Sequence, residues 1–476
     1  MVCLILTELI AERGRDFESA VRDALSELLP SQIVSDRDLT LERLVSMQSG
    51  LRDYWALTVL WGATPQDRFS IYQDAPEALK RIGGFHFAPG TQMSYCNTNF
   101  AAVGLAIEKA TGQTLGDLLH TRLFGPVGMK TAVLRPDTAR IPAPLIGYEG
   151  SETTGYIAYS NRIEWAGDAG IQASLEDMIA YEKYVHRNST VETSAYYKNA
   201  QEPKYIDDEP ANYGFGLVHG TVEEGVTTIG HSGGLAGFRL RRTYAPTEGL
   251  SVIVLLNSET DTKAVTDHVF KKLLTASSTA QPLDSNDRST QEKLEVSWQG
   301  NYFDDEAKLA VVVRQDKPGE VAVNYAGHDE KLKVQSENKA TSKEMQVSFE
   351  NGELKIARPL EHRTFTVRQL EVTPASSDAS MFVGKYYSQE IDSTFHVTGS
   401  GAMLYGTFDG YLGKGPAHLM RRLGKDIWWL ACFRSLDSPV PGNWTIAFSS
   451  NKDEQGVNGV TVGCWLAREV RYKKIG

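Results

Sequence analysis

The feature that most restricts the fold is a change of sequence pattern near residue 276. Residues 1–275 mix helical and strand periodicity, whereas short alternating strands with Gly and Asn turns dominate the rest. Residues 276–291 have no regular spacing of apolar side chains and are predicted to be a linker. A second polar stretch, Thr373–Ser380, divides the remainder into 292–373 and 380–476. We therefore predict one mixed α/β domain followed by two all-β domains.

The two all-β regions begin with similar segments. Trp298–Phe303 (WQGNYF) resembles Phe382–Tyr387 (FVGKYY), and Tyr386 stands 84 positions after Tyr302. This spacing suits one small antiparallel barrel or sandwich per region. Chance similarity between two first strands is the alternative, because only this segment matches clearly.

The first region contains signals for both helices and strands. Asn99–Thr111 has apolar residues near helical spacing and ends at Gly112, and Ser174 suits the N-cap of another helix. The other predicted elements are helices over Met1–Ile10, Leu115–Leu123 (closed by Gly125-Pro126) and Asp261–Leu274, and strands over Tyr213–Val218, Phe238–Tyr244 and Ser251–Leu256.

Charge and composition exclude several classes of function. The 476 residues include 49 basic and 60 acidic ones, and the net charge of −11 argues against binding nucleic acid or an anionic membrane. The apolar run Met1–Ile10 is too short to span a bilayer and lacks the features of a secretion signal, so we expect a cytoplasmic protein. Cys3, Cys96, Cys432 and Cys464 are not spaced as metal ligands or as a redox pair. We therefore expect free thiols, no metal and no cofactor.

Two motifs in the first region carry side chains suited to catalysis. Tyr95 and Asn97 (SYCN) lie between a turn signal and a predicted helix. His231 precedes Gly233 and Gly234 (GHSGG) at the start of a predicted strand, where glycines let backbone N–H groups approach a ligand closely. Each motif alone is weak, because a loop Tyr usually packs and a glycine-rich hairpin often carries an incidental His.

Taken together and in this order, the motifs resemble those of the penicillin-recognising serine hydrolases, and His-x-Gly resembles the D-stereospecific aminopeptidases among them. Gln48–Trp55 (QSGLRDYW) is similar to the Ser-Gly-Leu loop of the family, and Trp165–Ile171 (WAGDAGI) to its glycine-rich segment beside the site. Arg434–Trp444 is similar to a loop by which the last barrel of those enzymes reaches the active site. The resemblance implies an α+β fold, a β-lactamase-like sandwich domain followed by two antiparallel β-barrels.

The resemblance also implies a mechanism. A serine attacks the carbonyl of the substrate, a lysine one helical turn away activates it, and Tyr95 relays a proton to the leaving amine. Asn97 and His231 orient the substrate and Tyr95. Gly233 and Gly234 bind the substrate, and the Gly234 N–H is a candidate oxyanion donor.

Asp437, in the loop of the last barrel, is implied to hold the free α-amino group of the substrate. A turn residue before Pro439 is the alternative interpretation. The expected partner is a small peptide or amide with a free N-terminus, and a homodimer is left open. The preference for D-residues rests on the resemblance alone.

The sequence departs from the family at the nucleophile. Ser-x-x-Lys occurs only at Ser336–Lys339 and Ser449–Lys452, both in the all-β regions. The resemblance places the expected motif directly before Met1, together with strands whose absence would leave Ser251–Leu256 or a neighbour as a sheet edge. We expect no useful peptidase activity, because removing the nucleophile costs on the order of 10⁶ in rate. An inactive peptide-binding paralogue and a β-lactamase-like esterase are the alternatives.

Overall fold

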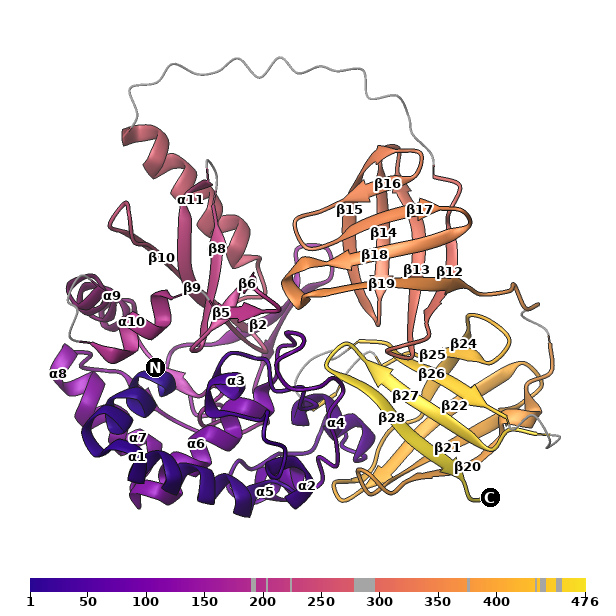
Figure 1. Cartoon of the computed structure of the whole chain (residues 1–476), viewed down its shortest axis with the longest axis horizontal. Coiled ribbons are helices and arrows are strands. Elements are labelled where there is room, and N and C mark those ends of the chain that lie inside the picture. Colours follow the sequence, from indigo (N-terminus) through magenta and orange to yellow (C-terminus); the bar gives the residue numbers. More distant parts are fainter. Residues whose placement is uncertain are drawn as a thin grey trace.

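A computed structural model describes residues 1–189, 194–202, 204–222, 225–277, 296–374, 377–432, 435–436, 442–450 and 456–476. A mixed α/β unit, here called the first unit, lies beside two β-barrels that are stacked on one another (Figure 1). This arrangement confirms the predicted α+β fold with two antiparallel barrels. No helix in the described ranges is long and apolar enough to span a bilayer.

Helices make up most of the first unit. The predicted helix over Met1–Ile10 is part of a longer one, α1 (Val2–Leu28), which packs against α6 (Asn97–Thr111). Gly14 interrupts α1 with a φ of 67°, a conformation that glycine adopts without strain. The others are α2 (Ser31–Val34), α3 (Leu41–Val45), α4 (Tyr54–Leu60), α5 (Asp74–Lys80), α7 (Leu115–Leu119), α8 (Gly125–Val127), α9 (Leu175–Ser189), α10 (Ala195–Gln201) and α11 (Thr262–Ser277).

One predicted helix end is wrong and one predicted cap is confirmed. Gly125-Pro126 does not close the helix, because α7 continues through a π-helical turn and α8 as far as Gly128, which has a φ of 83°. Pro126 lies directly after the π-helical turn, an irregular place in the helical hydrogen-bond ladder. At α9, the Asp177 N–H donates to Ser174 Oγ at 3.2 Å, and the Ser174 N–H donates back to the Asp177 carboxylate at 3.0 Å.

An antiparallel sheet completes the first unit, with the strand order β11-β10-β9-β8-β7. Its members are β7 (Tyr213–Gly214), β8 (Leu217–Thr221), β9 (Thr227–Leu235), β10 (Phe238–Ala245) and β11 (Leu250–Leu256). The strand predicted over Tyr213–Val218 is broken, because Phe215 and Gly216 have φ values of 49° and 75°. β11 is an outer strand in the described part of the chain, and a hollow of about 560 Å³ lies between it and α9.

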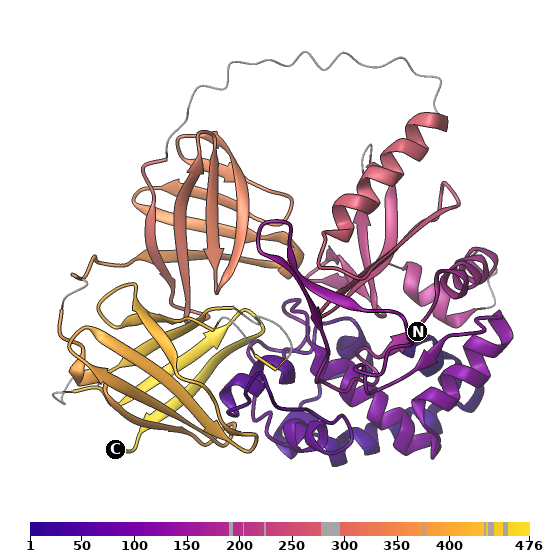
Figure 2. The same cartoon turned by 180° about the vertical axis from the view of Figure 1, so that it is seen from behind.

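Three small sheets flank this one. Their strands are β1 (Val133–Leu134) with β4 (Ile171–Gln172), β2 (Gly147–Ser151) with β3 (Gly155–Tyr159), and β5 (Lys204–Ile206) with β6 (Glu209–Ala211). The β2–β3 hairpin projects from the first unit on the side of the first barrel (Figure 2).

Both all-β regions close into barrels. The first barrel consists of β12 (Gly300–Asp304), β13 (Leu309–Lys317), β14 (Glu320–Tyr325), β15 (His328–Ser336), β16 (Lys339–Thr341), β17 (Gln346–Glu350), β18 (Glu353–Arg358) and β19 (Arg363–Gln369). The second consists of β20 (Gly384–Ser388), β21 (Ser393–Ser400), β22 (Met403–Gly410), β23 (Gly413–Lys414), β24 (His418–Arg422), β25 (Ile427–Leu430), β26 (Trp444–Ser449), β27 (Gly459–Cys464) and β28 (Ala467–Lys474), and closes through β21 and β22.

The matching segments occupy equivalent places in the two barrels, at their first strands. The Tyr302 hydroxyl donates to the Trp298 carbonyl at 3.0 Å, and the Tyr386 hydroxyl donates to the Phe382 carbonyl at 2.7 Å. The same hydrogen bond, four residues back along the chain, therefore recurs after 84 positions. This shared local geometry supports the predicted repeat over chance similarity.

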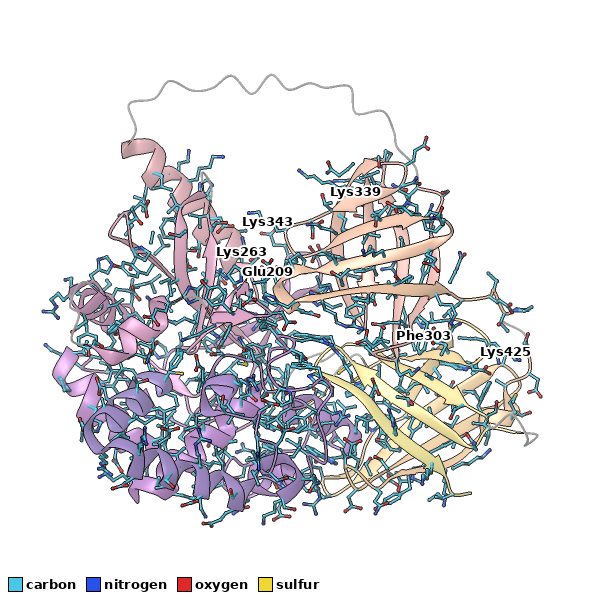
Figure 3. All side chains as sticks on the ribbon, viewed as in Figure 1. Glu209, Lys263, Phe303, Lys339, Lys343 and Lys425 are labelled. Carbon is cyan, nitrogen blue, oxygen red and sulfur yellow. The ribbon has the colours of Figure 1, made fainter. Side chains whose placement is uncertain are left out.

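The second barrel packs directly on the first unit around α4. Trp61, which follows α4, donates its indole N–H to the Ile391 carbonyl at 2.8 Å and accepts from the Leu412 N–H at 3.1 Å. Buried apolar side chains of these two parts form one continuous cluster, whereas the first barrel has a core of its own. Phe303 lies between the barrels (Figure 3), in a small cluster with Trp429.

Buried charged side chains join all three parts at one junction. Arg52 of the first unit pairs with Glu390 of the second barrel and donates to the Arg468 carbonyl at 2.7 Å. The Arg468 guanidinium contacts Glu361 of the first barrel at 3.3 Å and Gln92 of the first unit at 2.9 Å. Because Arg52 and Arg468 are almost fully buried, these contacts fix how the barrels sit on the loops that carry the predicted site.

Candidate functional site

The loop that carries Tyr95 is held from both sides. The Ser94 N–H donates to the Met47 carbonyl at 3.0 Å within the first unit. The Met93 N–H donates to the Glu361 carbonyl at 3.2 Å, so the first barrel also supports this loop. Tyr95 itself is partly exposed, two residues before the start of α6.

Tyr95 and His231 converge, as the sequence motifs predict. Their ring centroids are 6.3 Å apart. Tyr213 completes the group, with ring centroids 6.5 Å from Tyr95 and 5.7 Å from His231, and its hydroxyl lies 3.0 Å from His231 Nε2. Strand register brings Tyr213 here, because β7 pairs Tyr213 with Val218 and β8 pairs Val218 with Gly230, the neighbour of His231.

The hydrogen bonds of His231 define its tautomer. Nδ1 lies against the Ser232 carbonyl oxygen, which only accepts, so Nδ1 carries the proton. The Tyr213 hydroxyl therefore donates to Nε2. Burial lowers the pKa of His231, and its hydrogen bond to the Ser232 carbonyl opposes this shift only in part. The imidazole is accordingly neutral near neutral pH.

Tyr95 is a protonated phenol in this environment. Burial raises the pKa of Tyr95, and the carboxylates of Asp53 and Asp168 raise it further. A phenol of this kind donates a proton readily only when a strong base develops beside it. To act as a base, Tyr95 would have to lose its proton, which requires a nearby cation.

Asn97 is fixed next to the start of α4. The Asn97 N–H donates to the Asp53 carboxylate, which also caps α4 by accepting from the Trp55 and Ala56 N–H groups at 2.9 and 3.2 Å. Burial raises the pKa of Asp53 to about 6. The predicted pair Tyr95 and Asn97 thus lies between α4 and α6.

Asp168 is a further acidic residue beside the site. Its Oδ2 accepts from the Tyr54 hydroxyl at 2.7 Å, and burial raises the pKa of Asp168 to about 7. Sequence reasoning placed the segment Trp165–Ile171 near the site but singled out neither Asp168 nor Tyr213. An acidic side chain inside a glycine-rich segment was the one available signal for Asp168, and no local pattern marks Tyr213.

Of the other predicted site residues, the structure describes Gly233 and Gly234. Gly233 and Gly234 follow His231 on β9 and pair with Leu240 and Arg239 of β10. A Cβ atom on Gly233 would lie 2.9 Å from the Leu240 side chain, whereas Gly234 is exposed. Asp437 lies outside the described residues.

Neither the Ser-x-x-Lys matches nor the cysteines add a group to this site. Ser336 and Lys339 face each other across the β15–β16 turn of the first barrel, and Ser449 ends β26 of the second. All four cysteines are buried. Among the described residues, no group of three or more His, Cys, Asp or Glu side chains is placed to hold a metal ion.

Comparison with known families defines the class of protein first. Residues 2–277 match the model of the beta-lactamase family, and residues 291–473 match the model described as D-aminopeptidase, domain B. The first unit and its site are thus those of a β-lactamase-like hydrolase.

Whole-chain relatives narrow this class to one family. A D-aminopeptidase of Cereibacter sphaeroides is 36% identical over 438 residues, which are 92% of this chain and 81% of the relative. A D-aminopeptidase of Brucella melitensis is 37% identical over 435 residues, 91% of this chain and 80% of the relative. The chain belongs to the D-aminopeptidase family of β-lactamase-like serine hydrolases.

Solved structures with a similar fold are more distant. A D-stereospecific amidohydrolase from Streptomyces sp. is 21% identical with a TM-score of 0.48, over 56% of this chain and 83% of that one. An octameric penicillin-binding protein homologue from Pyrococcus abyssi is 17% identical with a TM-score of 0.48, over 77% and 86%.

Proposed function

We propose that the site around Tyr95, Asn97 and His231 binds small D-amino-acid peptides, amides or esters with a free N-terminus and serves acyl-enzyme hydrolysis. The convergence of Tyr95 and His231 at 6.3 Å, bridged by Tyr213, is the observation that carries this proposal. Membership of the D-aminopeptidase family supports the reaction class.

Each residue has a proposed role. Tyr95, as a neutral phenol, passes a proton to the leaving amine, which otherwise leaves as an unfavourable anion. Asn97 and neutral His231 orient the substrate and the Tyr95 hydroxyl. The Gly234 N–H stabilises the oxyanion, with Gly233 giving close backbone approach, and Asp437 is retained as a contact for the substrate amine.

We further propose that a chain of this sequence binds substrate without turning it over. The reaction needs a serine nucleophile and a lysine next to Tyr95, and the Ser-x-x-Lys matches lie in the barrels. Loss of the nucleophile removes on the order of 10⁶ in rate, which leaves only the contributions of binding and oxyanion groups. An inactive peptide-binding paralogue is the second candidate.

Hydrolysis of D-alanyl-p-nitroanilide tests both statements. We expect no release of nitroaniline by the chain itself, and release by a chain extended before Met1 with a helical turn carrying Ser-x-x-Lys. In the extended chain, Tyr95→Phe should lower the rate by roughly 10²- to 10⁴-fold. The matched control carries alanine in place of the added serine. Turnover by the unextended chain, or full activity of Tyr95→Phe in the extended one, would contradict the proposal.

A further inference from the structure

Two carboxylates, the buried Asp53 and the partly exposed Asp168, lie next to Tyr95, and their hydrogen bonds differ. Asp53 accepts from three backbone N–H groups and is thereby occupied as the cap of α4. Asp168 accepts from the Tyr54 hydroxyl at 2.7 Å and from the N–H of its neighbour Ala169 at 3.1 Å. Among the described residues no Lys, Arg or His forms an ion pair with Asp168. Asp168 thus retains unused capacity to accept hydrogen bonds from a cation.

Tyr54, the hydrogen-bond partner of Asp168, belongs to a group of neighbouring aromatic rings. The Tyr54 ring lies 6.3 Å from the Trp165 ring, and the Trp55 ring lies 6.4 Å from Trp165, between centroids. Rings of this kind attract cations through their faces, and together with a carboxylate they favour an ammonium group. Trp165 is buried and Trp55 partly exposed, so the rings extend from the interior toward solvent.

The backbone around Asp168 is fixed in place. Gly167 and Gly170 have φ values of 92° and 97°. A Cβ atom on Gly167 would lie 2.3 Å from the Phe100 carbonyl oxygen of α6, and one on Gly170 would lie 2.5 Å from the Trp165 carbonyl oxygen. The segment is therefore pressed onto α6, the helix that begins two residues after Tyr95, and holds Asp168 in one position.

We infer that Asp168 is a specificity-determining residue of this site and binds the α-ammonium group of a substrate with a free N-terminus. The inference rests on the proposed function and adds a second carboxylate to Asp437 for the same amine. Asp168 lies close enough to Tyr95 for its charge to act on the Tyr95 hydroxyl, and a substrate with its carbonyl beside Tyr95 would direct its α-amine, two bonds away, toward Asp168. An N-acylated substrate cannot supply the positive charge, so this contact separates aminopeptidase from endopeptidase substrates.

Binding measured on the chain as it is tests this role without any turnover. Isothermal titration calorimetry at pH 7 compares D-alaninamide with N-acetyl-D-alaninamide on the wild-type chain and on Asp168→Asn. We expect the wild type to prefer the free amine, and Asp168→Asn to lose roughly tenfold or more in affinity for D-alaninamide while N-acetyl-D-alaninamide is unaffected. Glu164→Gln, four residues upstream and hydrogen-bonded to Ser70, is the matched control and should behave as wild type.

Each other result has a distinct meaning. If Asp168→Asn keeps the full preference for the free amine, the inference is overturned, and a loss in Asp437→Asn then assigns the role to Asp437. If the wild type binds both ligands equally, Asp168 does not select the amine although the proposed function stands. If the wild type binds neither ligand, the proposed function fails and the inference fails with it. Circular dichroism of each variant shows whether the fold is retained.

Discussion

Without a bound cation, the carboxylate of Asp168 should destabilise the folded protein. The substitution Asp168→Asn measures this loss of stability. The pKa of Asp168 rises from its ordinary value of 3.8 to about 7 through burial. Between about pH 4 and pH 7 the folded protein therefore holds a proton that the unfolded chain has released, and raising the pH through this range lowers stability. Asparagine, which keeps an acceptor for the Tyr54 hydroxyl but never ionises, removes this loss.

The magnitude follows from the size of the shift. About 3 pKa units at about 1.4 kcal/mol each give an upper limit of ~4 kcal/mol at pH 8. Because Asp168 is partly exposed, solvent screens part of this penalty, and we expect Asp168→Asn to stabilise the protein by about 1–2 kcal/mol at pH 8 and by close to zero at pH 4. In a unit of this size that corresponds to a rise of roughly 4 °C in melting temperature.

Thermal denaturation of the wild type, Asp168→Asn and the control Glu164→Gln between pH 4 and pH 8 provides the assay. The reasoning predicts a difference in stability between Asp168→Asn and wild type that grows between about pH 4 and pH 7 and levels off at higher pH. A difference that stays constant with pH would refute it, because a loss of packing or of a hydrogen bond does not titrate in this range. D-Alaninamide should reduce the difference, since a bound ammonium stabilises the ionised carboxylate.

Three further predictions concern the supports of the site. Arg468→Met should destabilise the chain by about 3 kcal/mol in thermal denaturation, because it leaves acceptors of the first unit and the first barrel without their common donor, and an unchanged melting temperature would contradict the proposed junction. Gly167→Ala should destabilise the chain by about 2 kcal/mol or more, because Gly167 has a φ of 92° and its Cβ would meet a carbonyl oxygen of α6. Gly112 also has a positive φ but open space around it, so Gly112→Ala measures the cost of the backbone conformation alone. Tyr213→Phe should raise the pKa of His231 measured by NMR, because Nε2 loses the hydroxyl that donates to its neutral form, and an unchanged or lower pKa would contradict the assigned tautomer.

The fold class was predictable because its signals are local. Alternation, glycine turns and the recurrence of Tyr302 at Tyr386 are properties of short segments, and they predicted two all-β domains, whereas the closure of these domains into barrels was implied by the family resemblance. Helix ends were less predictable. Gly125-Pro126 is a stop signal in isolation, but the chain places Pro126 directly after a π-helical turn, an irregular place in the helical hydrogen-bond ladder.

The site was predictable only where a motif carries it. Tyr95 and His231 are marked by their neighbours in the sequence, and they do converge. Asp168 meets Tyr54 across 114 positions, and Tyr213 reaches His231 through the register of two strand pairs. Contacts of this kind depend on how distant segments dock, which no periodicity or spacing within one segment records.

The barrels support both the loop that carries Tyr95 and the helix α4, whose Tyr54 contacts Asp168. The second barrel fixes the end of α4 through Trp61, and α4 begins with Tyr54, the partner of Asp168. The first barrel fixes the loop of Tyr95 through Glu361, and Arg468 ties the two barrels together beside it. A displacement of either barrel therefore shifts Tyr95 and Asp168 relative to each other, since neither anchor belongs to the first unit alone. If Tyr95 and Asp168 serve the leaving amine and the α-amine as proposed, the three-part junction keeps them at the fixed spacing that a substrate presents.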